Sequence, residues 1–424
     1  MENERRITRS ANALLPERGF VPERLLAPNQ ALSLYFSHVA LAPVGSEDVG
    51  LDAAAGRILS ETLHADRDYP PIPRSTMDGF AIASSHAPGA FAIAGDVRMG
   101  TVSERHLMPG ETMRIPTGGA VPRGADAVVP VEAVHVDGGT VRVDAPVPAG
   151  DCITPPGDDM RAGETVLTRG TRIGAAQLGV LATIGCTAVP VYRRPQFAIL
   201  SSGDELVDAS ATPGHAQIRD SNRYAIAGAL AAMGAIPRHI ATVGDDPAAL
   251  ERAVAGALSW ADAVVLSGGS SVGAADYTPR VLDGFGPPGV VVHGLRVKPG
   301  KPTVLGAAGR RPLLGLPGNP ASALMILEGV AAPIVAALTG ACDAPREIAA
   351  RAGCAIRGRP GWTWFVPVAL SRGDEWPVAE PLGIRSSFVS LLARAGGYVV
   401  VGEDGAGAAA GEPVRVRLFS GGSG

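Results

Sequence analysis

The segment from about residue 191 to residue 342 alternates short apolar runs with helix-forming stretches, and this alternation constrains the fold most. Helices begin at capping positions such as Asp246-Pro247 and Asn319-Pro320, where Asp or Asn is the N-cap and Pro the first helical residue. Strands that alternate with helices of this length predict a doubly wound, mostly parallel α/β sheet. The predicted strands are 196–200, 237–243, 263–266, 290–293 and 312–316.

The flanking regions differ in character, and the 424 residues are enough for about three domains at roughly 150 residues each. The expected fold class is therefore multidomain, α/β plus β, with a central α/β domain, two smaller β-rich domains and a helical/linker domain. The expected segments are a disordered extension (1–28), a discontinuous helical/linker domain (29–65 and 161–190), a β-rich insertion domain (66–160), the α/β domain (191–342) and a C-terminal β domain (343–424).

Composition argues against several classes of partner. A formal net charge of −4 and an aromatic content of 4% disfavour nucleic-acid binding, which needs a basic face or a stacking platform. The cysteines are scattered without metal-ligand spacing, as expected for free thiols in a reducing compartment. The N-terminal residues lack a signal-peptide pattern, and no apolar run is long enough to cross a bilayer without Gly, Pro or charge. We expect a cytoplasmic protein with neither nucleic-acid nor membrane partners.

A Gly/Ser-rich loop follows the predicted strand at 263–266. In open α/β sheets, ligands bind outside the carboxyl ends of the strands, and this loop offers backbone N–H groups there. It is not a Walker A loop, because Ala274-Ala275 stand where Lys-Ser/Thr would be. A simple connecting loop is the alternative interpretation. The candidate substrate-binding residues are Ser267, Gly268, Gly269, Ser270, Ser271 and Gly273.

Two further loops belong to the same predicted edge. Lys298-Pro-Gly-Lys301 has the sequence of a type II turn, which would bring two ammonium groups close together and favour an anion between them. The alternative interpretation is that both lysines are solvated side chains at the surface and bind no anion. The segment 315–320 ends a strand and begins a helix, so Pro317, Gly318 and Asn319 are candidates for anion binding through first-turn amides. An ordinary connection between a strand and a helix would also explain this segment.

Carboxylates accompany these loops. Glu205 and Asp276 follow Gly-containing loops and have no capping role, so we expect them to be metal ligands or acid/base groups. Asp246 is a third candidate ligand, although its simpler role is the helix N-cap. Oxygen ligands of this kind suit Mg²⁺, which is usually held by one or two carboxylates plus substrate phosphates.

In the predicted β-rich domain, Asp78 and Thr117 lie at the tips of two turn-rich segments, 75–80 and 114–120. Composition alone would make these segments turns.

Seven motifs in series resemble the molybdopterin molybdenumtransferases, the family of the MoeA proteins and the gephyrin E domain. The likeness runs from about residue 30 to the C-terminus in unchanged order. The motifs are SerThrMetAspGlyPhe (75–80), ProThrGlyGly (116–119), SerGlyAspGluLeu (202–206), ArgAspSerAsnArg (219–223), SerGlyGlySerSerValGly with AspTyrThr (267–278), LysProGlyLysPro (298–302) and GlyLeuProGlyAsnProAlaSerAla (315–323).

The resemblance implies an elongated homodimer of four-subdomain chains, with the cleft between the α/β domain of one subunit and the β domain of the other. It implies hydrolysis of adenylylated molybdopterin to AMP while molybdate is inserted at the dithiolene. By the same resemblance, Asp78 and Thr117 reach across the dimer, and Glu205, Asp246 and Asp276 handle metal or molybdate. Lys298 and Lys301 bind the pterin phosphate or oxyanion, and a molybdoenzyme is the implied acceptor.

The chain departs from the family pattern outside its α/β motifs. Arg74 replaces the usual Asn before the Ser-x-Met-Asp-Gly motif, and segment 153–159 lacks an Arg-rich stretch. The Gly-Arg-x-x-Phe-x-Arg pattern is replaced by Gly361-Trp-Thr-Trp-Phe-Val-Pro367, and the paired Ser before Met-Ala-Arg-Ala becomes Ser390-Leu-Leu-Ala-Arg-Ala. These losses favour a divergent member, such as a specialised paralogue. They leave two alternatives open: a non-catalytic cofactor-binding or delivery protein, and an α/β domain that adenylylates molybdopterin.

Overall fold

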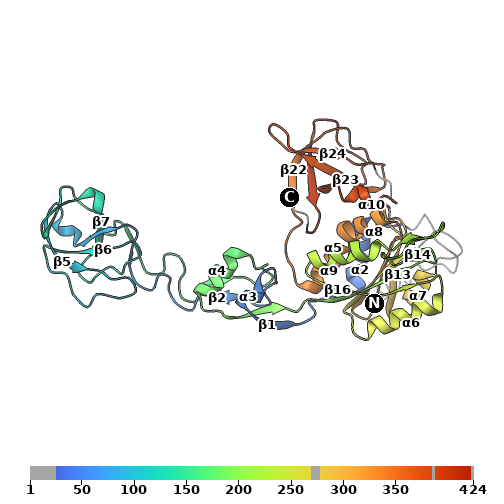
Figure 1. The fold of residues 1–424 in the computed structure, drawn as a ribbon, viewed down its shortest axis with the longest axis horizontal. Coiled ribbons are helices and arrows are strands. Elements are labelled where there is room, and N and C mark those ends of the chain that lie inside the picture. Colours follow the sequence, from blue (N-terminus) through green and yellow to red (C-terminus); the bar gives the residue numbers. More distant parts are fainter. Residues whose placement is uncertain (1–24, 269–276, 384–386, 422–424) are drawn as a thin grey trace, which may run out of the picture.

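A computed structural model describes residues 25–268, 277–383 and 387–421 (Figure 1). The molecule is elongated, with a β-rich domain at one end and the α/β domain at the other. A small linker domain lies between them, and the C-terminal domain sits on the α/β domain. The multidomain α/β plus β class predicted from the sequence is confirmed.

The α/β domain is built on a mixed sheet with strand order β16-β13-β17-β21-β20-β18. The first four strands in this order run parallel, and β20 and β18 are antiparallel to their neighbours. The prediction of a mostly parallel sheet is therefore confirmed. Its strands are β13 (Gln196–Ser202), β16 (Ile236–Val243), β17 (Ala263–Gly268), β18 (Pro288–His293), β20 (Val304–Ala308) and β21 (Arg311–Leu316), with a separate parallel pair β14 (Leu206–Val207) and β15 (Ile218–Arg219).

Helices cover both faces of this sheet, because successive residues of a strand point to opposite sides. Phe197 and Ile199 pack into one core, whereas Ala198 and Leu200 pack into the other. The first core is covered by α2 (Pro28–His38), α5 (Asn222–Ala232), α8 (Pro320–Ile326), a π-helical turn (Leu327–Ala331) and α9 (Ala332–Thr339). The second is covered by α6 (Pro247–Leu258) and α7 (Thr278–Asp283).

The first helix, α2, packs on the α/β domain. Its apolar face, formed by Ala31, Tyr35 and Val39, is buried in the same core as Phe197. The Tyr35 hydroxyl donates a hydrogen bond to the carbonyl of Gly306 in β20. The segment 29–65 predicted as one part of a helical/linker domain is therefore divided, because burying this apolar stripe against the sheet is favourable.

The linker domain has a small core around Leu59, Leu181, Val189 and Val191. It is mixed rather than helical, since two antiparallel strand pairs, β1–β12 and β2–β11, carry short helices. Its elements are β1 (Ser46–Gly50), α3 (Leu51–Ala54), β2 (Leu63–His64), β11 (Thr165–Leu167), α4 (Ala175–Thr183) and β12 (Ala188–Tyr192).

The β-rich domain is inserted between β2 and β11 and has strand order β7-β4-β6-β5-β9-β8. Two apolar clusters fill it, one around Phe80 and Phe91 and one around Val97 and Met113. Its elements are β3 (Arg74–Ser75), β4 (Gly79–Ile82), β5 (Gly89–Asp96), β6 (Glu111–Ile115), β7 (Ala127–Pro130), β8 (His135–Asp137), β9 (Thr140–Val143) and β10 (Ile153–Thr154), with 3₁₀ turns at Ser84–His86 and Val131–Ala133.

The C-terminal domain is a closed sheet, because β23 pairs with both β24 and β25. The short strand β19 (Val297–Lys298), which belongs in sequence to the α/β domain, joins this sheet by pairing with β23. The two domains are thus connected by backbone hydrogen bonds as well as by the chain. The elements are β22 (Glu347–Ala352), β23 (Thr363–Ser371), β24 (Val378–Pro381), α10 (Val389–Leu392), β25 (Gly397–Val401) and β26 (Pro413–Leu418).

Within the described residues, one helical stretch, Pro320–Thr339, is long and apolar enough to cross a bilayer, with a mean hydropathy of 2.0. Inside the protein, 67% of the 18-residue apolar window within this stretch is buried. It is the central helix of the first α/β core, where Ile326, Val330 and Ile334 are fully enclosed.

Candidate functional site

The side chain of Asn222 joins two loops at the carboxyl edge of the α/β sheet. Asn222 is the first residue of α5 and is buried. Its Nδ2 donates to Ser267 Oγ at the end of β17 and to the carbonyl of Gly318 after β21, both at 2.7 Å. One amide group therefore holds two of the predicted anion-binding loops in a fixed relation.

A narrow crevice lies beside Asn222, at the paired ends of β13 and β17. Its lining includes four of the predicted site residues, Glu205, Ser267, Gly268 and Gly318. Gly268 has φ of +103°, and a Cβ atom there would lie 2.1 Å from the carbonyl oxygen of Ser202. The end of β17 consequently needs glycine, both for its backbone conformation and for its close approach to β13.

Tyr277 connects the loops that follow β13 and β16. Its hydroxyl lies 2.9 Å from Ser202 Oγ and donates to Asp245 Oδ1 at 2.9 Å. Burial raises the pKa of Tyr277 to about 12, so the phenol stays protonated as a donor near neutral pH. Asp204 Oδ1 in turn accepts a hydrogen bond from the backbone N–H of Asp245. Exposed carboxylates of Asp204, Glu205 and Asp245 are thereby gathered on one edge.

Asp246 is the N-cap of α6, as the sequence predicted. Its Oδ1 accepts a hydrogen bond from the N–H of Ala248 at 2.9 Å, and Oδ2 lies 3.9 Å from the guanidinium of Arg252. The candidate residues Gly269, Ser270, Ser271, Gly273 and Asp276 lie outside the described residues. Among the residues that are described, no group of three or more His, Cys, Asp or Glu side chains is arranged as a metal centre.

A wider hollow of about 400 Å³ opens on the other side of the loop after β21, between the α/β and C-terminal domains. Lys298, Lys301 and Asn319 line it together, as the sequence predicted, and Ser322 and Arg359 contribute further polar groups. We call it the lysine hollow. Gly318 lines the crevice and Asn319 lines the lysine hollow, so the two spaces share one loop. Pro317, also predicted as a site residue, is buried beneath that loop.

Tryptophans of the C-terminal domain hold two cations at the lysine hollow. Lys298 is paired in register with Trp364 across β19 and β23, and its Nζ lies 4.2 Å from the centre of the Trp364 ring. The guanidinium of Arg359 lies 5.6 Å from the Trp362 ring. Such cation–π contacts orient the charged groups without neutralising them.

The turn between Lys298 and Lys301 contains a cis Lys298–Pro299 peptide, and Gly300 has a positive φ of 112°, as the third position of the predicted type II turn requires. An X–Pro bond can take either isomer at small cost, which the sequence pattern does not specify.

In the β-rich domain, Asp78 and Thr117 contact each other. Thr117 donates its backbone N–H at 2.6 Å and its hydroxyl at 2.9 Å to Asp78 Oδ1. These two bonds, the backbone bond first, hold the pKa of Asp78 below its usual range. Asp78 also lines a hollow of about 460 Å³ with Asp96 and Arg114. Within one chain this domain is at the far end of the molecule from the α/β domain (Figure 1).

Sequence reasoning assigned no role to several residues that shape these spaces. Asn222 lies in the segment 219–223, whose sequence does not reveal that its side chain bonds to two distant loops. Trp362 and Trp364 lie two residues apart at the start of β23, and this spacing places both on one face. Their partners could not be predicted, since β19 and β23 meet only through folding. The residues missed are Asn222, Tyr277, Ser322, Arg359, Trp362 and Trp364.

Three family descriptions match consecutive parts of the chain. Residues 26–185 match the MoeA N-terminal region (domain I and II), residues 198–337 a probable molybdopterin binding domain, and residues 349–419 the MoeA C-terminal region (domain IV).

Curated relatives extend over most of the chain. The molybdopterin molybdenumtransferase of Synechocystis is 32% identical over 83% of this chain and 90% of its own length, and that of Bacillus subtilis is 31% identical over 88% and 90%. A crystal structure of the molybdopterin biosynthesis MoeA protein from Pyrococcus horikoshii covers 94% of this chain and 100% of its own, with 29% identity and a TM-score of 0.78.

The fold and these matches together define a MoeA-type multidomain architecture, with a molybdopterin-binding type of α/β domain at its centre. The chain belongs to the molybdopterin molybdenumtransferase family. The resemblance carried by the seven motifs is thus confirmed.

Proposed function

We propose that this protein is the enzyme that inserts molybdenum into molybdopterin during molybdenum cofactor biosynthesis. Molybdate and adenylylated molybdopterin are the substrates, and AMP is released in a reaction that requires Mg²⁺. The observation that carries this proposal is the loop at Gly318 and Asn319, with a carboxylate-lined crevice on one side and the lysine hollow on the other.

Lys298 and Lys301 are the proposed partners of the pterin phosphate or of molybdate. Both substrates are anions, and ammonium groups held beside backbone amides stabilise an anion before it arrives. The amide group of Asn222 fixes the loops that present these amides.

Exposed carboxylates at and beside the crevice have the ligand chemistry that a magnesium ion requires. Glu205 and Asp245 present exposed carboxylates at the sheet edge, and Mg²⁺ is usually held by one or two carboxylates together with substrate phosphates. We propose Glu205, Asp246 and Asp276 as its ligands. When bound, the ion would offset the negative charge of the phosphoanhydride.

We propose that a second copy of the chain completes the site. Asp78 and Thr117 form a preorganised pair, but they are separated from the lysine hollow by the whole linker domain (Figure 1). An arrangement of two elongated chains, with the β-rich domain of one against the α/β domain of the other, would place them there. A homodimer is therefore part of the proposal.

The proposed location is the cytoplasm, with a molybdoenzyme as the acceptor of the product. The four cysteines, all within the described residues, are free thiols, which suits a reducing compartment.

A reconstitution assay tests the function. Full-length protein is mixed with adenylylated molybdopterin, Mg²⁺ and molybdate, and both AMP and active cofactor are measured. We expect AMP release that depends on molybdate, and its loss in the Lys298→Ala, Lys301→Ala variant. Absence of both products would reject the proposal. Tight cofactor binding without AMP release would indicate a delivery protein, and ATP consumption with molybdopterin alone would indicate an adenylylating enzyme.

A further inference from the structure

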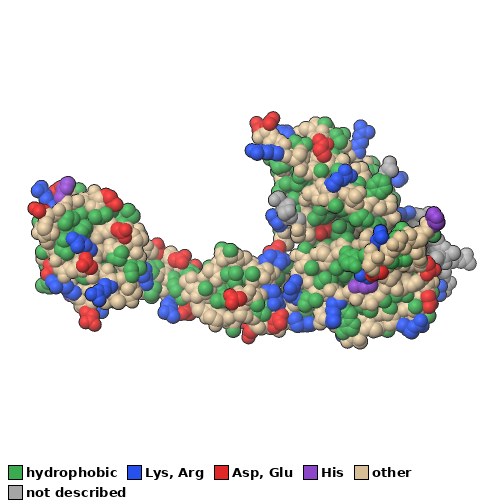
Figure 2. Space-filling model, viewed as in Figure 1, with side chains coloured by type: hydrophobic (Ala, Val, Ile, Leu, Met, Phe, Trp, Pro, Cys, Tyr) green, Lys and Arg blue, Asp and Glu red, His purple; other side chains and the backbone are tan. Residues whose placement is uncertain are grey.

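A second concentration of positive charge lies at the joint between the linker domain and the α/β domain. A hollow of about 240 Å³ opens there, and its described lining includes Arg57, Arg172, Arg193 and Arg194 but no aspartate or glutamate. Figure 2 shows Lys and Arg side chains gathered where the narrow middle of the molecule meets its large end. The hollow at this joint shares no lining residue with the lysine hollow.

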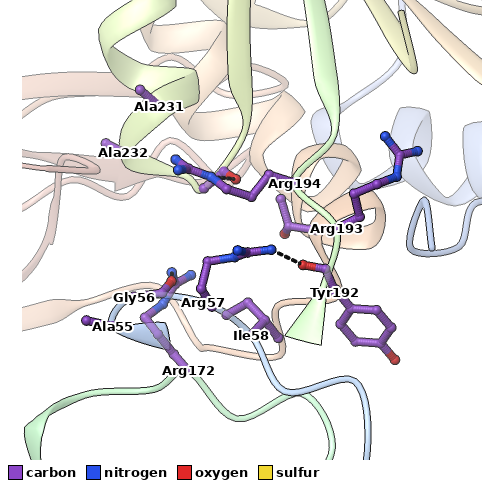
Figure 3. Close-up of a pocket in the computed structure, with 12 residues that line it drawn as sticks. Ala55, Gly56, Arg57, Ile58, Arg172, Tyr192, Arg193, Arg194, Ala231 and Ala232 are labelled. Atoms are coloured by element: carbon purple, nitrogen blue, oxygen red, sulfur yellow. Dashed lines mark hydrogen bonds between the residues drawn. The ribbon is translucent and has the colours of Figure 1, made fainter. Parts of the chain in front are cut away.

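The arginines come from two structural units. Arg57 and Arg172 belong to the linker domain, whereas Arg193 and Arg194 lie on the segment that leads from β12 into β13. Figure 3 shows Arg57 and Arg194 extending from opposite walls of the hollow, while the guanidinium of Arg193 turns away. A ligand held between Arg57 and Arg194 would therefore contact both units.

Three of the four arginines have a carboxylate partner, and each of these partners lies outside the lining. Arg57 pairs with Glu47, Arg172 with Asp343 at 2.7 Å, and Arg193 with Asp262 at 3.4 Å. These pairs neutralise part of the charge from the outer side of the hollow.

Arg194 differs, since its hydrogen bonds in the described structure go to backbone carbonyls. Its Nε donates to Gly234 at 3.1 Å and its Nη2 to Ala235 at 3.4 Å, just beyond the C-terminal end of α5. No carboxylate among the described residues forms an ion pair with it. Arg194 thus leaves one formal positive charge at the hollow without an acidic counterpart.

Arg57 and Arg194 also have N–H groups that are not used in the hydrogen bonds of the described structure. A guanidinium carries five N–H donors. Arg57 uses only Nη2 for its bonds to Glu47 and to the carbonyl of Tyr192, and Arg194 does not use Nη1. Guanidinium groups that line one hollow repel each other unless an anion lies between them. Planar, forked donors of this kind match the oxygens of phosphate.

The geometry points to an oxyanion-binding site in this hollow, which takes a phosphate group and bridges the linker and α/β domains. The ligand class is a tetrahedral oxyanion, either free phosphate or the phosphate of a small molecule such as a nucleotide. Its bonds to Arg57 and Arg172 on one side and to Arg194 on the other would restrict movement at the joint. This site does not depend on the catalytic proposal.

Calorimetric titration tests the site in a Lys298→Ala, Lys301→Ala background, which removes the competing lysine hollow. Inorganic phosphate and AMP are titrated separately into the full chain. We expect binding of one phosphate group per chain, weakened about tenfold or more by Arg194→Gln or Arg172→Gln, because each removes a charge-assisted bond. Arg142→Gln, an exposed change in the β-rich domain, is the control and should bind normally.

The two ligands separate the sources of the phosphate. Equal affinity for phosphate and AMP indicates recognition of the phosphate alone, and tighter binding of AMP that Arg194→Gln weakens indicates a nucleotide; both support the site. Should Arg194→Gln lower the melting temperature, Arg194→Lys keeps the charge but loses the fork and is expected to bind with intermediate affinity. The inference would be overturned if neither phosphate nor AMP bound. It would also be overturned if both arginine variants bound these ligands with unchanged affinity.

Discussion

Thr117 donates both its backbone N–H and its hydroxyl to one oxygen of Asp78, at 2.6 Å and 2.9 Å. The two residues lie 39 positions apart, on separate turns whose contact no local sequence pattern predicts. The carboxylate is exposed yet held in one orientation, and its pKa is lowered by the same two bonds. A preorganised anionic group at the surface of the β-rich domain is what a site completed by a second subunit would require.

Thr117→Val removes the hydroxyl and keeps the side-chain shape. Because the backbone bond stays and the side-chain bond is lost, the pKa of Asp78 should rise toward its ordinary value without reaching it. Titration of the Asp78 carboxyl by NMR measures this shift. Thr117→Ser, which keeps the hydroxyl, is the control and should leave the pKa low. An unchanged pKa in the valine variant would mean that the side-chain bond is absent in solution.

The Lys298→Ala, Lys301→Ala double variant should lower affinity for the pterin substrate by at least about tenfold, because hydrogen bonds to charged groups are lost. Its melting temperature should change little, since Lys298 is exposed and neither ammonium group is part of a hydrophobic core. Binding and thermal denaturation are measured on the same samples. Arg310→Ala, an exposed cation before β21 at the opposite end of that strand, should affect neither quantity. A large loss of stability with normal affinity would contradict the assignment.

Trp364→Leu tests the cation–π contact of Lys298. The indole ring lies 4.2 Å from the ammonium group, and contacts of this kind contribute about 0.5–1 kcal/mol at exposed sites. We expect a two- to fivefold weaker affinity for the anionic substrate, which corresponds to that energy. Trp364→Phe retains an aromatic face, so its affinity for the substrate should lie between those of the native protein and of Trp364→Leu. Equal affinities for the leucine and phenylalanine variants would exclude an electrostatic role of the ring.

Gly268→Ala should destabilise the protein by about 3 kcal/mol or more, because φ is +103° and the new methyl group would meet the Ser202 carbonyl. Gly256→Ala is the matched control. It lies inside α6 with open space around a Cβ atom, so the same substitution should stabilise the helix by about 0.5–1 kcal/mol. Chemical denaturation of both variants measures the difference. A Gly268→Ala protein as stable as the native one would refute the close approach of β17 to β13.

Glu328 gives the chain a pH-dependent stability. It is 8% exposed, and burial raises the pKa of its carboxyl group, although Ser420 donates two groups to it. Because folding raises the pKa of Glu328, the protonated carboxyl group stabilises the fold, and this stabilisation is complete below the ordinary pKa of a glutamate. It is lost as the pH rises through the folded value. Glu328→Gln should flatten the decline in melting temperature above about pH 5, and an unchanged pH profile would exclude Glu328 as its source.

Several parts of the fold were predictable because local patterns agree with the tertiary structure. Asp246 caps α6, and the helix after Asn319-Pro320 runs to Thr339. Five of the six strands of the α/β sheet fall where apolar runs predicted them, whereas β20 (Val304–Ala308) was not predicted. The sheet edge follows from the same pattern, so Lys301 and Asn319 were expected in one hollow and are found there.

Other relations depend on contacts between segments that are distant in sequence. Helix α2 joins the α/β core because its apolar stripe is buried most fully there, and its sequence alone is compatible with packing against either domain. The strand β19 pairs with β23 of the C-terminal domain, which places Trp364 beside Lys298.

The order of strands, helices and motifs along the chain is enough to establish the MoeA-type architecture and the edge of the sheet where charge collects. Secondary-structure propensity and the spacing of hydrophobic residues depend on a few neighbouring residues, so the sequence alone determines both. The contacts of Asn222 with two loops, the pairing of Asp78 with Thr117 and the four arginines at the joint arise only in the folded chain. Each joins segments tens to more than a hundred residues apart, and such contacts form only where several domains pack and their loops close together.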